Sequence, residues 1–405
     1  MRHAPLWFDR FPKARRRSFP RLRGPHTARA VIIGGGLTGA ACALTFATAG
    51  IDVVVLESAA VGGGMTAGDP GLLREGLAGS FQTAAGRYGL KTSRAVAEAM
   101  RRGALDFAAA LRRAGIKCDL EPRDVITCAA ATTVAGRLLR REYQARHDAG
   151  LAGTWLTPAA VAREVSVESA GGIKTHAATI DPYRACVGLV AGAIARGARV
   201  HEKSMVGRIR AAKNHVEVLT DGGSVRAETV VVATAAPIQD LRGLRRHVRA
   251  EHAYGVLTEP LPAAVRRQVG QRRTIVEPAV ELGRVVRWMP DDRVLVHGAR
   301  QPEVPARNRE RATTQRSGQL MYELSLLYPA ISGVPASASW DGLDYETVDG
   351  LPFLGPHRNY PRHLFAFGSS RHGAGLAWVA ARVALRHFQG EPTREDEPLG
   401  FQRIL

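Results

Sequence analysis

A glycine-rich turn between a strand and a helix is the feature that most constrains this chain. Residues 31–40 read VIIGGGLTGA, so an apolar strand enters a Gly-x-Gly-x-x-Gly turn and continues into a helix-forming run. Gly34 permits the tight turn, Gly36 lets a phosphate approach the backbone, and Gly39 lets the helix lie close to the strand. The positive end of the helix and its unpaired N–H groups attract an anion.

A second predicted strand covers residues 52–56 and leads directly into Glu57, eighteen residues after Gly39. In βαβ units of this kind, an acid near this position hydrogen-bonds the ribose of a bound dinucleotide. The alternative is a glycine-rich turn that binds nothing. The two strands, the helix and the acid favour a dinucleotide site, with Gly34, Gly36, Leu37, Thr38, Gly39 and Glu57 as its candidate residues.

Length and charge limit the remaining possibilities. The 405 residues predict two domains, and an apolar content of 45% suffices for buried cores. No run of eighteen apolar residues exists, so we expect no segment that spans a membrane. A formal net charge of +19 attracts anions, nucleic acid among them. The positive residues are mostly arginines spread along the whole chain, as in an arginine-rich proteome, so we expect no nucleic-acid partner.

The first 28 residues are polar and arginine-rich, and we expect them to form an arm over the surface. Arg16 and Arg17 resemble a twin-arginine export signal, but no apolar core follows them. The four cysteines are isolated in the sequence, which suits reduced and mostly buried thiols. We therefore expect a cytoplasmic protein. Neither the cysteines nor the 13 histidines show the spacing of metal ligands.

Several later segments accompany the first turn. They are a glycine-rich loop over residues 62–73, Asp181-Pro182 at the start of a helix, RWMPDDR at 287–293, WDGLDYETVDGLPFLG at 340–355, and the loop GSSRHGAG at 368–375 before a final helix. With these motifs, nearly the whole chain past Arg29 resembles the D-amino-acid-oxidase-like family of FAD-dependent oxidoreductases, which includes glycine and sarcosine oxidases.

The resemblance implies an α/β fold with an α+β substrate part. A Rossmann-like FAD-binding domain is assembled from discontinuous segments and joined to a substrate domain with a mixed sheet. On this interpretation, residues 1–28 are the N-terminal arm. The FAD-binding domain comprises residues 29–80, 172–240 and 340–395, and the substrate domain comprises residues 81–171 and 241–339.

The resemblance also assigns residues to FAD. A glycine-rich loop that enters the last helix can direct N–H groups and a positive helix end at the flavin, where negative charge develops during reduction. Some relatives attach flavin covalently at positions that here are Gly68 and Gly342, so we expect noncovalent FAD. Arg371 or His372 either adds positive charge beside the flavin or is solvated. The remaining residues assigned to FAD are Gly64, Met65, Thr66, Val206, Ala233, Gly368, Gly373, Gly375 and Leu376.

The reaction implied by the resemblance is hydride transfer from a C–H group next to nitrogen to flavin N5. The substrate is then a small amine or an amino-acid-like molecule, with oxygen or another molecule as electron acceptor. Amino-acid-oxidising relatives carry Gly-Leu-Arg-Pro, whose arginine binds the substrate carboxylate. This chain has Gly342-Leu343-Asp344-Tyr345, and Asp344 would repel a carboxylate and could attract an ammonium group. Arg287 then either binds an anion or forms a structural salt bridge.

No catalytic dyad stands out in the sequence. Two other functions remain open, a flavoprotein that modifies RNA and a noncatalytic FAD-binding subunit. A nicotinamide dehydrogenase fits the first turn but explains neither C-terminal motif. The candidate catalytic residues are Arg287, Asp344, Tyr345 and His372, and the further pocket candidates are His252, Tyr254, Trp288 and His297.

Overall fold

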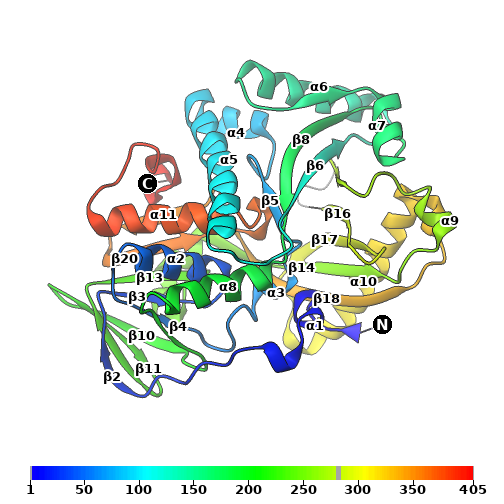
Figure 1. The fold of residues 1–405 in the computed structure, drawn as a ribbon. Coiled ribbons are helices and arrows are strands. Elements are labelled where there is room, and N and C mark those ends of the chain that lie inside the picture. The colour runs from blue at the N-terminus through cyan, green and yellow to red at the C-terminus, as the bar shows by residue number, and fades with distance from the viewer. Residues whose placement is uncertain (1, 280–283, 405) are drawn as a thin grey trace.

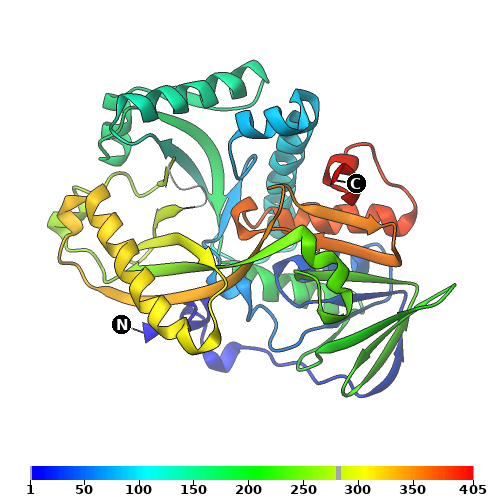
Figure 2. The same cartoon turned by 180° about the vertical axis from the view of Figure 1, so that it is seen from behind.

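Three sheets organise the part of the chain that the computed structural model describes, residues 2–279 and 284–404 (Figures 1 and 2). A six-stranded sheet carries the glycine-rich turn. Its strands, in spatial order, are β19 (Phe353–His357), β20 (Tyr360–Phe367), β13 (Thr229–Ala235), β3 (Ala30–Ile33), β4 (Val53–Leu56) and β9 (Arg199–His201). Neighbours are parallel except β19 and β20. The predicted α/β class, with a parallel sheet built from distant segments, is confirmed.

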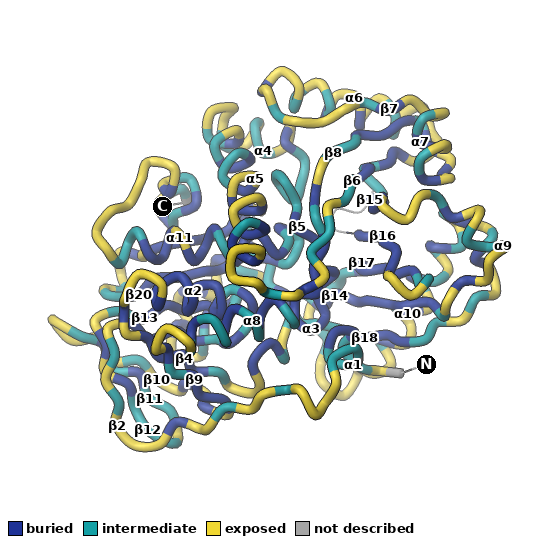
Figure 3. Tube along the Cα trace, viewed as in Figure 1, coloured by how far each residue is buried: buried dark blue, intermediate teal, exposed yellow. Residues whose placement is uncertain are grey.

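Both faces of this sheet are covered. Ala30 and Ile32 of β3 belong to a core shared with α2 (Leu37–Thr48), α8 (Pro182–Ile194) and α11 (Leu376–Gln389). Val31 and Ile33 belong to a second core, against the four-stranded sheet. Because successive side chains of a strand point to opposite faces, a run of four apolar residues suits a strand buried on both sides. Figure 3 shows these central strands as buried.

The four-stranded sheet forms the outer layer on the side away from the helices. Its strands, in spatial order, are β10 (Val206–Ala211), β11 (Val216–Thr220), β12 (Gly223–Ala227) and β2 (Gly24–Thr27). Val216, Val218 and Val225 of this sheet belong to the second core, together with Val31 and Ile33 of β3.

The third sheet is mixed and has ten strands. In spatial order they are β1 (Arg2–His3), β18 (Ala336–Thr347), β14 (Val248–Thr258), β17 (Val294–Pro302), β16 (Val285–Trp288), β15 (Thr274–Pro278), β6 (Glu121–Cys128), β8 (Gly172–Thr179) and β5 (Leu72–Arg74), with β7 (Thr154–Leu156) paired to β8. Three strands of this sheet, β5, β8 and part of β18, lie in ranges assigned above to the FAD-binding domain. The sheets therefore do not coincide with the predicted domain ranges, and the division into domains stays a prediction.

Helices cover the large sheet and join it to the layer of helices on the six-stranded sheet. α10 packs against β14, β17 and β18, and α5 packs against α11. Thr132, Thr157 and Asp181 cap the helices that follow them, each accepting a backbone N–H three residues ahead. None of the helices in the described ranges is both long and apolar enough to cross a bilayer. The helices not yet given are α1 (Leu6–Arg10), α3 (Met65–Gly68), α4 (Phe81–Tyr88), α5 (Leu90–Arg113), α6 (Thr133–Asp148), α7 (Pro158–Val165), α9 (Ala263–Arg266) and α10 (Arg309–Leu327).

The N-terminal arm is part of the fold. Its first strand, β1, pairs with β18, and β2 pairs with β12. Leu6, Trp7 and Leu22 are buried, and the Trp7 indole donates a hydrogen bond of 2.7 Å to the carbonyl oxygen of Asp69. The expectation of an arm that only lies over the surface is wrong, because a polar average composition concealed three well-placed apolar side chains. The four cysteines, in contrast, are free and buried as expected.

Candidate active site

A cavity of about 510 Å³ lies where β3, β4 and β13 end at their carboxyl edge. The helical connection from β3 leads to β4 on one side, while β13 lies on the other side of β3. Ligands of parallel α/β sheets bind at such a switch point. The cavity extends to the C-terminal loop, where Gly368, Ser369 and Ser370 line it.

The glycines of the first turn leave no room for side chains. Gly34 has φ +106°, and a Cβ there would lie 2.6 Å from the carbonyl oxygen of Ala233. A Cβ on Gly39 would lie 1.8 Å from the carbonyl oxygen of Gly34. Gly36 faces the cavity, and its Cβ would come 3.3 Å from Thr66 Oγ1. The turn is therefore open toward the cavity and tightly closed behind it.

Glu57 fixes the conformation of this turn. Its Oε2 accepts a hydrogen bond of 2.7 Å from the backbone N–H of Gly35, and its Oε1 accepts one of 2.8 Å from Ala59 N–H. Thr66 Oγ1 accepts a further bond from the N–H of Leu37. Each carboxylate oxygen has two lone pairs, so Glu57, which lines the cavity, keeps the capacity to accept hydroxyl groups. Its contact with ribose stays a prediction.

Most residues assigned to FAD line this one cavity: Gly34, Gly36, Leu37, Thr38, Glu57, Gly64, Met65, Thr66, Val206, Ala233, Gly368, Gly373 and Leu376. Gly39 lies behind the turn, and Gly375 lies against Ala104 of α5. The N–H groups of Gly373 and Leu376 donate within their own loop, so the positive end of α11 is the main electrostatic contribution of this segment. The cavity also includes Ser204, Met205 and Thr234, which no motif marked.

The positions of covalent flavin attachment in some relatives are crowded here. A Cβ on Gly68 would lie 2.9 Å from the ring of Trp340, whose indole donates to the Gly68 carbonyl oxygen. A Cβ on Gly342 would lie 3.1 Å from Met65 Sδ. Because glycine has no side-chain atom that could bond to a flavin at either position, the cradle suits a cofactor held without a covalent bond.

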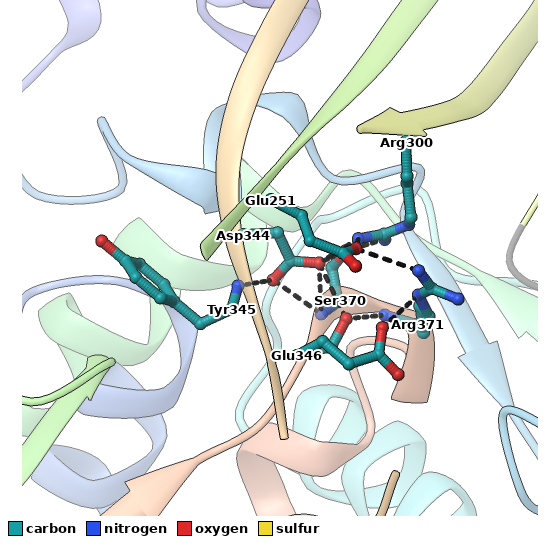
Figure 4. A network of polar contacts seen from close by, with 8 residues as sticks. Glu251, Arg300, Asp344, Tyr345, Glu346, Ser370 and Arg371 are labelled. Atoms are coloured by element: carbon teal, nitrogen blue, oxygen red, sulfur yellow. Dashed lines mark hydrogen bonds and ion pairs between the residues drawn. The ribbon is translucent and has the colours of Figure 1, made fainter. Parts of the chain in front are cut away.

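A charged network lies beside the C-terminal loop, and Asp344 is at its centre (Figure 4). Its carboxylate accepts hydrogen bonds from Arg300 Nη1 at 2.6 Å, Ser369 Oγ at 2.8 Å and Ser370 Oγ at 2.7 Å. The backbone N–H groups of Ser370 and Tyr345 also donate to it. Asp344 thereby joins β18 to the loop that lines the cofactor cavity.

The charge of Asp344 is stabilised by its partners. Burial acts to raise the pKa of its carboxyl, but the positive charge of Arg300 and the hydrogen bonds outweigh burial and lower the pKa to about 2. The two side chains are almost fully buried, with exposed fractions of 2% for Asp344 and 7% for Arg300. Asp344 thus holds the loop in place. Its negative charge, which could have attracted a substrate ammonium group, is already balanced by Arg300 on β17.

The other members of the loop are also constrained. Arg371 forms ion pairs with Glu251 at 2.9 Å and Glu346 at 2.6 Å. Burial lowers the pKa of His372 to about 4, so its ring is neutral at pH 7 and Arg371 is the cationic residue of the pair. Tyr345 points away from the network, as Figure 4 shows.

Arg287 is buried beneath the glycine-rich loop. Its Nη1 donates to the carbonyl oxygens of Pro70 at 2.6 Å and Gly71 at 3.2 Å, and its guanidinium lies 5.6 Å from the centroid of the Trp7 ring. Burial, together with the charge of Arg123, lowers the pKa of Arg287 to about 10. These contacts hold backbone rather than an anion.

Three further pocket candidates lie on strands of the ten-stranded sheet and have hydrogen-bond partners there or nearby. His252 Nδ1 lies 2.9 Å from Asp341, and Trp288 donates to the carbonyl oxygen of Val269. The Tyr254 hydroxyl accepts a hydrogen bond from Gln301. These contacts account for the polar atoms of all three side chains within the fold.

The fourth candidate, His297, lines a small inner cavity of about 10 Å³. Arg74, Arg300 and Arg371 also line it, and it shares Ser370 and Gly373 with the cofactor cavity. Burial, followed by the charge of Arg300, lowers the pKa of His297 to about 3. Sequence reasoning missed Arg74 and Arg300, because the strands that bring them here carry no recognisable motif.

Asp69 is another missed residue of the cofactor cavity, and it titrates near neutral pH. Burial raises its pKa from 3.8 to about 7, although the N–H of Gly71 acts in the opposite direction. Between these two values the folded protein binds a proton that the unfolded chain has lost. The free energy of unfolding therefore decreases as pH rises through this range, and each pKa unit is worth about 1.4 kcal/mol.

Asp69→Asn is expected to remove this pH dependence. The variant should gain stability relative to the wild-type protein at pH 8 and gain much less at pH 5, as measured by urea unfolding at both pH values. Asp106→Asn, at an exposed position of α5, serves as the control and should shift stability equally at both. A stability difference for Asp69→Asn that is the same at pH 5 and pH 8 would contradict the assignment.

Most of the chain matches the model of a known protein family. The model of a family described as FAD-dependent oxidoreductase (DAO) matches residues 29–386. The chain is 27% identical to gamma-glutamylputrescine oxidoreductase of Escherichia coli strain K12, over 93% of this chain and 87% of that protein. It is 28% identical to glycine oxidase of Geobacillus kaustophilus strain HTA426, over 87% and 90% of the two chains.

Solved structures share the fold. The crystal structure of glycine oxidase from Geobacillus kaustophilus superposes with a TM-score of 0.76 at 22% identity, covering 94% of this chain and all of the other. That of L-proline dehydrogenase from P. horikoshii gives a TM-score of 0.75 at 18% identity, covering 94% of this chain and 99% of the other.

Proposed function

Because the chain belongs to the DAO family of FAD-dependent oxidoreductases, we propose that it oxidises a carbon–nitrogen bond of a small amine or amino-acid-like substrate. FAD binding and oxidoreductase activity follow from the family, and the substrate class is the proposal. The observation that carries it is the small cavity that adjoins the cofactor cavity at Ser370 and Gly373 and is lined in part by three arginines.

The relatives support this substrate class. Gamma-glutamylputrescine oxidoreductase and glycine oxidase are named for a compound with amine groups and for an amino acid, and both match this chain over most of its length. The charged side chains that line the inner cavity would suit a polar molecule better than an apolar one.

Bound FAD would accept a hydride from the carbon next to the substrate nitrogen. The turn at Gly36 and the acid Glu57 would hold the dinucleotide part, and the positive end of α11 would face the flavin. Asp344 fixes Ser369 and Ser370, so the loop is preorganised before substrate arrives. An inner cavity of about 10 Å³ has room for roughly one water molecule, so the binding site excludes bulk water.

His297 and His372 would remain neutral beside a bound substrate at pH 7. They therefore add no positive charge to that of the three arginines that line the inner cavity. We propose oxygen or a second molecule as the electron acceptor. A cytoplasmic location also stays a proposal, and it rests on the four unpaired cysteines.

The proposal is tested with the purified holoprotein under anaerobic conditions. We expect a yellow protein whose flavin absorbance bleaches when one member of a panel of amines and amino acids is added. The matched hydroxy compounds, which lack the nitrogen, should leave the spectrum unchanged. Flavin that dithionite reduces but no amine reduces, or that a hydroxy acid reduces instead, would reject an amine substrate.

A further inference from the structure

Arg74 lines both a surface cavity and the small cavity beside the cofactor cavity. An outer cavity of about 80 Å³ lies between β5, β6, β15 and the helices α5 and α6. The exposed residues Arg101 and Ala152 are at its rim, and Arg74 and Glu277 are at its base. Arg74 is also a wall of the inner cavity, which adjoins the cofactor cavity. Three cavities thus follow one another, and Arg74 separates the first from the second.

Arg74 and Glu277 hold each other through two parallel contacts. Arg74 Nη1 donates to Glu277 Oε2 at 2.6 Å, and Arg74 Nη2 donates to Oε1. Only 15% of the arginine side chain and 9% of the glutamate side chain are exposed. Arg74 Nε is buried, and it has no hydrogen-bond partner among the described residues. The arginine therefore has one donor still available on a residue that borders both cavities.

We propose that Arg74 and Glu277 form a gate through which substrate passes from the outer cavity to the flavin. The gate rests on the proposed function, because the inner cavity is taken as the substrate side of the flavin. With the ion pair formed, the inner cavity has room for about one water molecule, so a substrate enters only when the pair separates.

The backbone around Arg74 is held in place by its neighbours. Gly71 is confined, since a Cβ there would lie 2.2 Å from the carbonyl oxygen of Ile180. The carbonyl oxygen of Leu72 accepts the N–H of Ala374 in the cofactor loop. The backbone of Arg74 is also paired with Ala177 of β8, so the gate opens by rotation of the arginine side chain while the strand stays attached to the cofactor loop.

Separation of Arg74 from Glu277 also determines which kinds of molecule can enter the inner cavity. Separating two buried charges is costly unless new partners replace the old ones. A small molecule that carries its own charges can pair with Arg74 or Glu277 as they part, and an uncharged molecule cannot. The gate therefore favours charged amines over neutral molecules of the same size.

The test measures access to the flavin in the holoprotein by acrylamide quenching of flavin fluorescence lifetimes. Arg74→Met/Glu277→Met removes both charges and should raise the quenching constant several-fold. The reversed pair, Arg74→Glu/Glu277→Arg, should return the constant toward the wild-type value. As a control, Arg386→Met/Asp396→Met removes a largely buried pair between the end of α11 and the segment after it, and should leave the quenching constant unchanged. Should the first double variant fail to fold, Arg74→Lys, with a single shorter donor, should give an intermediate increase.

Two results would overturn the gate. One is a folded, FAD-loaded Arg74→Met/Glu277→Met protein with wild-type quenching. The other is a Glu346→Gln variant that alone opens the flavin to acrylamide, which would place the route beside Arg371. Reduction by amines in the wild-type protein separates the gate from the proposed function. If an amine reduces the flavin while quenching is unchanged in the double variant, only the gate is wrong. If quenching rises as expected but no amine reduces the flavin, only the substrate class is wrong.

Discussion

Asp344→Asn is expected to lower the free energy of unfolding by about 3–5 kcal/mol, the usual cost of leaving a buried charge without its partner. The substitution keeps the shape of the side chain but removes the negative charge that Arg300 faces at 2.6 Å. It also weakens the hydrogen bonds that hold Ser369 and Ser370 against the cofactor cavity. We therefore expect faster release of FAD as well as lower stability.

Thermal unfolding and the rate of FAD release measure the two effects. Asp344→Asn/Arg300→Met should recover part of the lost stability, because it removes the unpaired cation. Glu228→Gln is the control, since its ion pair with Arg29 is about half exposed and such pairs are worth at most about 1 kcal/mol. If Asp344→Asn and Glu228→Gln lose similar amounts of stability, the network does not support the loop in the way described.

Gly39→Val is expected to abolish FAD binding. Even its first carbon would lie 1.8 Å from the carbonyl oxygen of Gly34, so helix α2 must move away from β3 and the turn must change shape. The helical glycine Gly86 is the matched control: a Cβ there meets no atom within 4 Å, and Gly86→Ala should keep full FAD content.

Flavin absorbance per protein after gel filtration measures this outcome, and far-ultraviolet circular dichroism reports whether the chain has folded. A Gly39→Val protein that retains stoichiometric FAD would show that the turn tolerates a displacement of α2. It would also remove the steric reason for glycine at this position.

Most residues that the sequence assigned to FAD line one cavity, because the signals that mark them are local. Gly34, Gly36 and Glu57 lie within one βαβ unit, where spacing alone determines which groups meet. The charged network was not predictable in this way. Asp344 was visible as an unusual residue, but its partner Arg300 comes from another strand and is brought to it by the pairing of β17 with β14 and of β14 with β18.

The contacts of the N-terminal arm and of Arg287 were also not predictable, because their partners are distant in the sequence. Pairing of β1 with β18 depends on a strand more than three hundred residues away, and composition contains no sign of it. The sequence left Arg287 either as an anion-binding residue or as part of a structural salt bridge, yet it donates hydrogen bonds to carbonyl oxygens of the glycine-rich loop. Tertiary partners decided both cases, and neither partner is near in sequence.

The order of strands in the six-stranded sheet has a consequence for biosynthesis. β3, β13 and β20 are neighbours in space, but they leave the ribosome early, midway and near the end of translation. Until β20 has been made, β13 has a vacant edge and the apolar faces of the emerging strands lack their cover. Such distant pairings slow folding and prolong exposure to aggregation. Newly made chains of this protein must therefore remain unfinished, and in need of protection, for most of the time that synthesis takes.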